Sequence, residues 1–177
     1  MCIRDRIDII IENGGKNLIS VSDNGIGIKK DHIPLAIERH ATSKLPDNTL
    51  NKIEYLGFRG EALPSIAAVS ELNLQSKYID SNQAWSLDVF AGDFKEVYPS
   101  SLETGTKVSI KKLFFATPAR LKFLKSSQVE KSYCQLAVLK MALVNPFVGF
   151  SLKADGRELL NIKPENKSEG LYLNRIR

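Results

Sequence analysis

The sequence contains few of the residues that define metal-binding or disulfide-rich proteins. Its 177 residues include only two cysteines and two histidines. Cys2 and Cys134 have neither the spacing of a metal site nor the density of a disulfide scaffold, and Cys134 falls in an apolar helical pattern that predicts a place in the core. His32 and His40 are too isolated to suggest a zinc site. We therefore expect no metal site built from these residues.

Long apolar runs are also missing. No stretch approaches the roughly 20 residues that a membrane-spanning helix needs, and the first residues do not resemble a secretory signal. The Gly-x-x-x-x-Gly-Lys-Ser/Thr signature of a P-loop is absent as well, so a bound nucleotide must be held in another way. The lack of a membrane span and of a secretory signal predicts a soluble intracellular chain.

The composition is that of an ordinary globular domain. Hydrophobic residues make up 43% and charged residues 25%, and the net charge is +5. A positive balance permits an acidic partner such as DNA, although a solvated basic surface explains it equally simply. The residues that could form a phosphate-contacting surface are Lys107, Lys111, Lys112, Arg120, Lys122 and Lys125.

Hydrophobic periodicity predicts alternating strands and helices. Patterns of period two predict strands at residues 7–11, 18–22, 72–78, 85–89, 94–98, 106–113, 147–153 and 157–162. Helical patterns occupy residues 33–40, 61–69 and 128–144, and Thr117 before Pro118 predicts the capped start of a short helix. Residues 41–60 are polar and predict a long connection of the kind that forms lids. We expect a two-layer α/β sandwich with helices on a mostly antiparallel mixed sheet.

The segment Asp-Asn-Gly-Ile-Gly at residues 23–27 follows the first predicted hairpin. The Asp23 carboxylate can only accept hydrogen bonds, so it suits an exocyclic amine such as the adenine 6-amino group. Gly25 and Gly27 permit tight turns and close approach of a ligand. Taken alone, the segment also fits an ordinary turn at the end of a hairpin.

Other polar segments could contact phosphates. Residues 57–63 place two glycines and Arg59 directly before a predicted helix, where backbone N–H groups favour anions. Residues 42–44 add two hydroxyls and an ammonium group. Arg59 could instead be a solvated residue at a helix entry. Thr106 follows Gly105 at the start of a predicted strand. Its hydroxyl could support Asp23 or bond the base through water, or Thr106 could simply be a β-branched residue in a strand.

In combination these segments resemble a known family. The blocks that carry the resemblance are Asp23–Gly27, Arg39–Lys44, Gly57–Leu63, Gly105–Thr106 and Thr117–Leu124. From about Arg6 onward, their order is similar to the N-terminal ATPase region of the MutL family of DNA mismatch repair proteins. That family belongs to the GHKL superfamily, so the resemblance implies the Bergerat ATP-binding sandwich. The alternatives are a nucleotide- or DNA-binding module without turnover, or another GHKL-superfamily ATPase domain.

The resemblance assigns roles by position. It implies that Asp23 accepts the adenine amine, that Gly27 lines the base pocket and that Thr106 lies on the adenine side. The residues implied for the lid and the phosphates are Thr42, Ser43, Lys44, Arg59, Gly60, Glu61, Ala62 and Leu63. In the parent protein, the resemblance implies an ATP-driven switch that pairs into a homodimer and binds DNA together with a mismatch-recognition protein of the MutS type. A bacterial parent and a cytoplasmic location are also implied.

The ends of the chain depart from the family pattern. In the family, a helix ahead of Arg6 carries the glutamate that activates water and the asparagine that holds Mg²⁺, whereas residues 1–5 are atypical here. We therefore expect residues 6–170 to form an ATPase domain that lacks its first helix, and residues 171–177 to begin the link to a missing transducer domain. No catalytic residue is assigned, and we expect this chain not to hydrolyse ATP alone. Although it has no membrane span, the missing first helix would leave apolar sheet surface exposed, so we expect the isolated chain to be poorly soluble.

Overall fold

A computed structural model describes residues 5–39, 41 and 59–165. The strands are β1 (Arg6–Glu12), β2 (Leu18–Asp23), β3 (Glu71–Lys77), β4 (Ala84–Phe90), β5 (Asp93–Phe94), β6 (Tyr98–Ser100), β7 (Gly105–Lys111), β8 (Gly149–Ala154) and β9 (Arg157–Ile162). The α-helices are α1 (Ala62–Ala67), α2 (Pro118–Leu121) and α3 (Ser127–Val144), and the 3₁₀ helices are η1 (Asn13–Gly15), η2 (Lys30–His32) and η3 (Leu35–Ile37). None of the described helices is long and apolar enough to cross a membrane.

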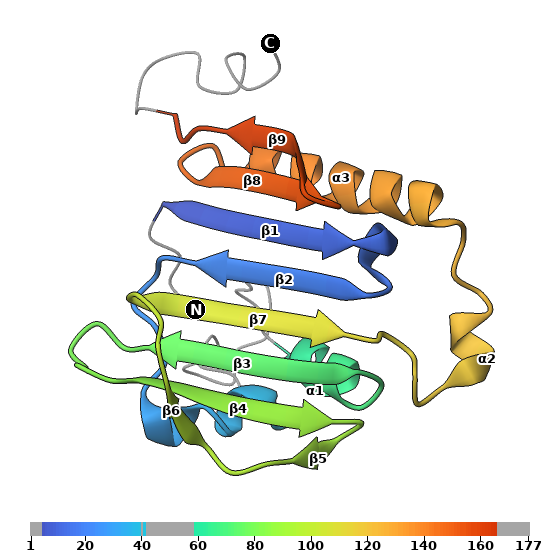
Figure 1. Ribbon diagram of the computed structural model, residues 1–177. Coiled ribbons are helices and arrows are strands. Elements are labelled where there is room, and N and C mark those ends of the chain that lie inside the picture. The colour runs from blue at the N-terminus through green and yellow to red at the C-terminus, as the bar shows by residue number, and fades with distance from the viewer. Residues whose placement is uncertain (1–4, 40, 42–58, 166–177) are drawn as a thin grey trace.

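All described strands join one mixed sheet. Its order is β5-β4-β3-β7-β2-β1-β8-β9, with β6 paired to β4. Every pairing is antiparallel except that of β1 with β8. Figure 1 shows α3 behind β8 and β9, and α1 behind the lower strands, so these two helices cover the same face, while α2 lies beyond the ends of the strands. The predicted two-layer sandwich is confirmed.

The covered face of the sheet is apolar because alternate residues of each strand point toward the helices. One core cluster lies against α1 and η3, and consists of Ile33, Ile37, Ala67, Leu72, Leu74, Leu87, Val89 and Ile110. The other lies against α3, and consists of Ile9, Ile11, Ala142, Phe150, Leu152 and Ala154. Cys134 is half-buried and packs against this second cluster, as its apolar pattern predicts. Burial, with the charge of Glu130, raises the pKa of its thiol.

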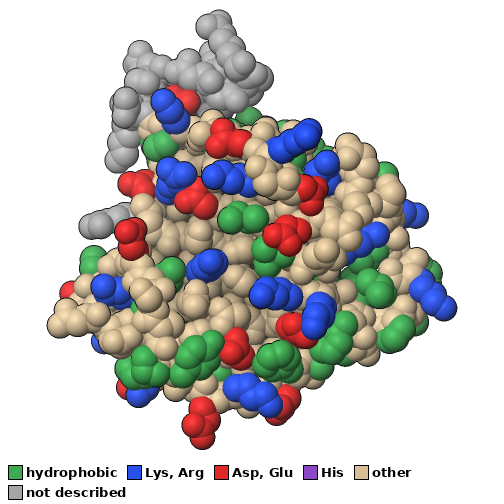
Figure 2. All heavy atoms as spheres, viewed as in Figure 1, with side chains coloured by type: hydrophobic (Ala, Val, Ile, Leu, Met, Phe, Trp, Pro, Cys, Tyr) green, Lys and Arg blue, Asp and Glu red, His purple; other side chains and the backbone are tan. Residues whose placement is uncertain are grey.

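The opposite face is mostly polar, although a few hydrophobic side chains such as Ile10 and Phe90 are exposed there. On β1 and β8, Asp8 forms an ion pair of 2.8 Å with Arg6 and accepts a hydrogen bond from Ser151. On β3 and β4, the Asn73 amide donates to Asp88 at 2.6 Å. Figure 2 shows basic and acidic side chains interspersed over this face. A sheet can keep one face in water when its alternate residues are polar.

Two sequence predictions need correction. Residues 33–40 were expected to form one helix, but the described part of this range contains only the 3₁₀ helix η3. The turn is not continued because the backbone is already extended at Glu38, with ψ 145°, while Ile33 and Ile37 still reach the core. The strand expected at residues 94–98 is instead the two short edge strands β5 and β6.

The start of α2 also differs in detail from the prediction. Thr117 occupies the N-cap position before Pro118, but its side chain makes no capping hydrogen bond. Its hydroxyl is buried with no partner among the described residues. The side-chain cap appears at α3 instead, where the Ser126 hydroxyl accepts from the Val129 N–H.

The turn between β1 and β2 anchors the start of α3. Asn13 accepts a hydrogen bond from the Ser127 hydroxyl. Gly14 has φ +66°, and a Cβ there would lie 2.5 Å from the Ser127 carbonyl oxygen. Only glycine fits this position, since a side chain would meet both backbone strain and a collision.

Replacing Gly14 with alanine tests this contact. Gly14→Ala should lower the free energy of unfolding by about 3 kcal/mol, because strain and overpacking add. Gly156→Ala is the matched control, since Gly156 has φ +78° and a Cβ added there would meet nothing within 4 Å. It should cost only about 1 kcal/mol. Urea unfolding of both variants measures the difference, and equal losses would contradict the packing role of Gly14.

Candidate functional site

Asp23 ends β2 on the covered face of the sheet and is only 8% exposed. One carboxylate oxygen, Oδ1, accepts a 2.9 Å hydrogen bond from the Gly25 N–H. The other, Oδ2, is buried and has no hydrogen-bond partner in the described structure. Burial raises the pKa of Asp23, and the backbone N–H groups of Gly25 and Thr106 oppose that rise. A buried acceptor without a partner is costly, and a ligand that donates to it is one explanation for its presence.

Two further polar side chains lie in the same row of the sheet. Thr106 on β7 pairs with Asp23 on one side and with Ser76 of β3 on the other. Thr106 is 1% exposed and Ser76 is fully buried. Directly paired residues of antiparallel strands share a face. Three neighbouring strands therefore place a polar row at the end of an otherwise apolar surface.

Two glycines allow the surrounding backbone to pack closely. A Cβ at Gly27, which has φ +75°, would lie 2.0 Å from the Lys77 carbonyl oxygen. A Cβ at Gly105 would lie 2.1 Å from the carbonyl oxygen of Asp23. Gly27 thus brings the loop after Asp23 onto the end of β3, and Gly105 brings the start of β7 against Asp23.

Asn24 connects the same loop to the start of β1. Its side-chain oxygen accepts hydrogen bonds from the N–H groups of Asp5 and Arg6, at 3.3 and 3.1 Å. Its amide in turn donates to the Asp5 carboxylate. The loop is therefore tied to β1 by Asn24 while Asp23 faces the interior.

The second sequence motif leads into α1. A Cβ at Gly60 would lie 2.5 Å from the Ala41 carbonyl oxygen, so the two described ends of the connection meet there. Leu63 of α1 and Ile28 of the Asp23 loop pack against the same core cluster. The structure therefore gathers the Asp23 loop and α1 around one cluster. Of the other residues predicted for this region, Arg59, Glu61 and Ala62 lie at the start of α1.

Three predicted residues cannot be placed. Thr42, Ser43 and Lys44 lie outside the described residues. Within the described ranges, no three acidic, cysteine or histidine side chains form a set that could hold a metal ion.

A hollow of about 230 Å³ lies elsewhere, at the ends of β1, β8 and β9. Arg6, Ser151 and Asn161 line part of it, and none of the predicted site residues does. Arg6 is already paired with Asp8. This hollow therefore adds nothing to the case for a site at Asp23.

Sequence reasoning missed Ser76. Leu72 and Leu74 alternate inward along β3, so the next inward position falls on Ser76. The signal that could have identified Ser76 is a small polar residue at a position where the alternating pattern predicts an apolar one. Its hydrogen bonds to the Asp23 loop and β7 make it part of the site.

Comparison with known proteins agrees with the motifs and the fold. No protein-family profile matches the chain. It is 47% identical over 162 residues to the DNA mismatch repair protein MutL of Rickettsia bellii, and 44% identical over 168 residues to that of Paramagnetospirillum magneticum. These matches cover 92% and 95% of this chain but 26% and 28% of those proteins. The chain thus spans about a quarter of the length of the curated relatives it matches.

Solved structures give the same result. The MutL ATPase domain of Aquifex aeolicus complexed with ADP superposes with a TM-score of 0.77 and 28% identity, over 97% of this chain and 59% of that one. The fold is that of a GHKL-type ATPase domain. The chain belongs to the MutL family of DNA mismatch repair proteins and corresponds to their ATPase region.

The raised pKa of Asp23 predicts a pH-dependent cost to stability. A carboxyl whose pKa is raised by folding favours the folded state at low pH, and that contribution is lost as the pH rises through the raised pKa. Asp23→Asn removes the buried charge and keeps an oxygen for the Gly25 N–H. It should therefore raise the free energy of unfolding at pH 7.

The gain should disappear as the pH falls below the ordinary carboxyl pKa of 3.8, where Asp23 is protonated too. Urea unfolding across this pH range measures the difference between the two proteins. A destabilised Asp23→Asn protein at pH 7 would show that the carboxylate has a partner that stabilises it.

Proposed function

We propose that this chain binds an adenosine nucleotide, ATP or ADP, at Asp23. The observation that carries the proposal is the buried Oδ2 atom of Asp23, which has no partner among the described residues. An adenine 6-amino group donates the hydrogen bond that this atom lacks. Guanine presents a carbonyl oxygen at the same place, which an acceptor repels. Support comes from the related Aquifex aeolicus domain, which was solved with ADP.

The remaining predicted residues receive roles consistent with this pose. Gly27 packs beneath the base and Thr106 supports its adenine side. The phosphates are proposed to lie toward the segment that leads into α1, with the lid supplied by the connection before it. The residues of this second group are Thr42, Ser43, Lys44, Arg59, Gly60, Glu61, Ala62 and Leu63.

ATP hydrolysis and the wider repair functions are proposals for the whole protein. They comprise an ATP-driven switch with Mg²⁺ bound alongside the nucleotide, homodimer formation, DNA binding and cooperation with a mismatch-recognition protein of the MutS type. The support is the similarity of this chain to MutL proteins. Within the chain, we propose residues 6–170 as the nucleotide-binding domain, flanked by residues 1–5 and by a link at residues 171–177.

Nucleotide titration of an Asp23 variant tests the proposal. In Asp23→Asn the side-chain oxygen remains with Gly25 and the new amide nitrogen faces the adenine amine, so two donors oppose each other. ADP affinity should fall by roughly 10- to 100-fold, as expected for losing a hydrogen bond to a charged group. Isothermal titration calorimetry with ADP measures this loss.

Asp8→Asn is the matched control, because Asp8 lies on the opposite face of the sheet and pairs with Arg6. Its ADP affinity should equal that of the unmodified chain. Equal ADP affinity of the Asp23→Asn protein and the unmodified chain would overturn the assignment of Asp23. Failure of the unmodified chain to bind ADP would overturn the proposal itself.

A further inference from the structure

Ser76 combines complete burial with three polar partners. Its hydroxyl lies at the end of β3, in the row that contains Asp23 and Thr106. We propose that Ser76 is a positioning residue for base recognition: it clamps the Asp23 loop and sets the hydrogen-bond polarity of Thr106, which favours adenine over guanine. The inference rests on the proposed nucleotide function.

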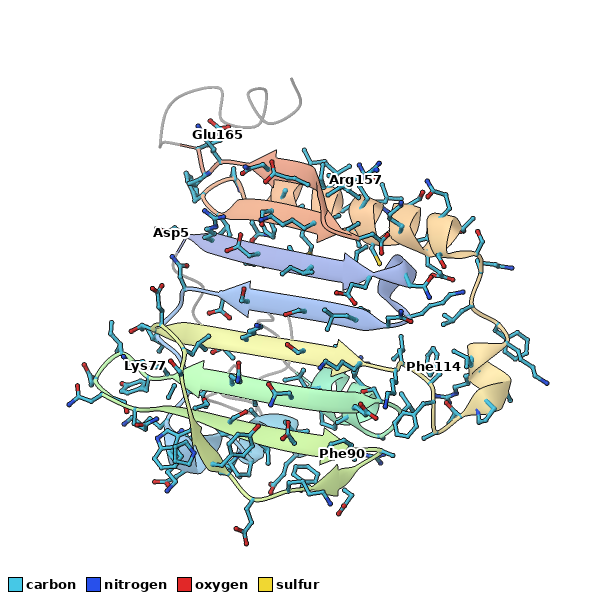
Figure 3. All side chains as sticks on the ribbon, viewed as in Figure 1. Asp5, Lys77, Phe90, Phe114, Arg157 and Glu165 are labelled. Carbon is cyan, nitrogen blue, oxygen red and sulfur yellow. The ribbon has the colours of Figure 1, made fainter. Side chains whose placement is uncertain are left out.

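The clamp is visible in the contacts between the loop and β3. The Ile28 N–H donates to the Ser76 hydroxyl at 2.8 Å. Just past the end of β3, the Ile79 N–H donates to the Ile26 carbonyl at 2.9 Å. Between these bonds, Gly27 lies directly against Lys77, which Figure 3 labels at the end of β3. The loop is thus fixed to β3 on both sides of Gly27.

The polarity of Thr106 follows from counting hydroxyl protons. The Gly105 carbonyl can only accept, so the 2.8 Å bond to it uses the single proton of Ser76. The Ile28 N–H occupies one lone pair of the same oxygen. The Thr106 hydroxyl, 3.0 Å away, must therefore be the donor in its bond to Ser76. With its proton committed, the Thr106 oxygen offers only lone pairs to any other group.

This polarity matters because Thr106 is paired with Asp23. Both side chains then present acceptors in the same row. These acceptors favour a base whose edge donates a hydrogen bond, directly or through a water, as the adenine amine does. They disfavour a base that presents a carbonyl oxygen, as guanine does. Without Ser76, the Thr106 hydroxyl could rotate and donate, which would relax the discrimination between adenine and guanine.

Ser76→Ala tests the inference through base selectivity. We expect the ratio of ADP to GDP affinity, measured by calorimetry, to fall by about five- to tenfold, the value of roughly one net hydrogen bond. Ser86→Ala is the matched control, because Ser86 is also fully buried but lies on β4 with the Asn73 amide as its partner. It should leave the ratio unchanged. An unchanged ratio in the Ser76→Ala protein would overturn the role in selectivity.

The clamp has a readout that needs no nucleotide. Hydrogen exchange of the Ile28 amide, followed by NMR, should become faster in the Ser76→Ala protein and not in the Ser86→Ala protein. Unaltered Ile28 protection would overturn the clamp. If the unmodified chain bound neither nucleotide, the proposed function would fail while this measurement still decided the clamp.

A second variant, at Thr106, tests the same hydroxyl in case the Ser76→Ala protein does not fold. Thr106→Val keeps the shape of the side chain but removes the hydroxyl whose polarity Ser76 sets. It should lower the ADP to GDP ratio by a similar factor, and adding Ser76→Ala should lower it little further, because both act through one hydroxyl. Fully additive effects would contradict that shared route.

Discussion

The buried carboxylate of Asp23 is the constraint around which the site is arranged. Placing a charge at the end of an apolar sheet face is unfavourable unless hydrogen bonds surround it. The structure supplies only part of that compensation: the Gly25 N–H bonds Oδ1, the Thr106 backbone N–H also favours the charged form, and Oδ2 keeps no hydrogen-bond partner among the described residues. Gly27 and Gly105 permit the close backbone packing that keeps Asp23 buried. Asn24 fixes the loop to β1, so that Asp23 stays on the covered face. An incomplete shell of donors is what a recognition site needs, since the ligand provides the remainder.

Most of the fold followed from the sequence because its patterns are local. Strands with clear alternation, such as β1 and β3, and the long apolar pattern of α3 were predicted within one or two residues. The mixed character of the sheet was also predicted, whereas the parallel partner of β1 was not, since no local pattern specifies pairing over such a distance. Asp23, Gly25 and Gly27 were recognised because they lie within five consecutive residues, so the acceptor and the flexible backbone beside it can be identified from the sequence alone.

The remaining features depend on contacts between distant residues. The helix expected from residue 33 ends after a single 3₁₀ turn, because the backbone is extended at Glu38 despite a good apolar period. Thr117 lacks the expected capping bond although its residue type and position are suitable. The role of Ser76 depends on its hydrogen bonds to β7 and to the Asp23 loop, which only the folded structure shows. Sequence periodicity shows that such a residue faces inward, but its partners come from elements 29 and 48 residues away.

The parallel pairing of β1 with β8 has a consequence for how the chain acquires its structure. Asp8 and Ser151, which join the two strands, are 143 residues apart. During synthesis β1 can pair with β2 early, because a short turn connects them, but its other edge stays open until almost the whole domain has emerged. Pairing of β8 with β1 is therefore the step that covers this edge, and until then an isoleucine-rich strand edge is exposed to other nascent chains.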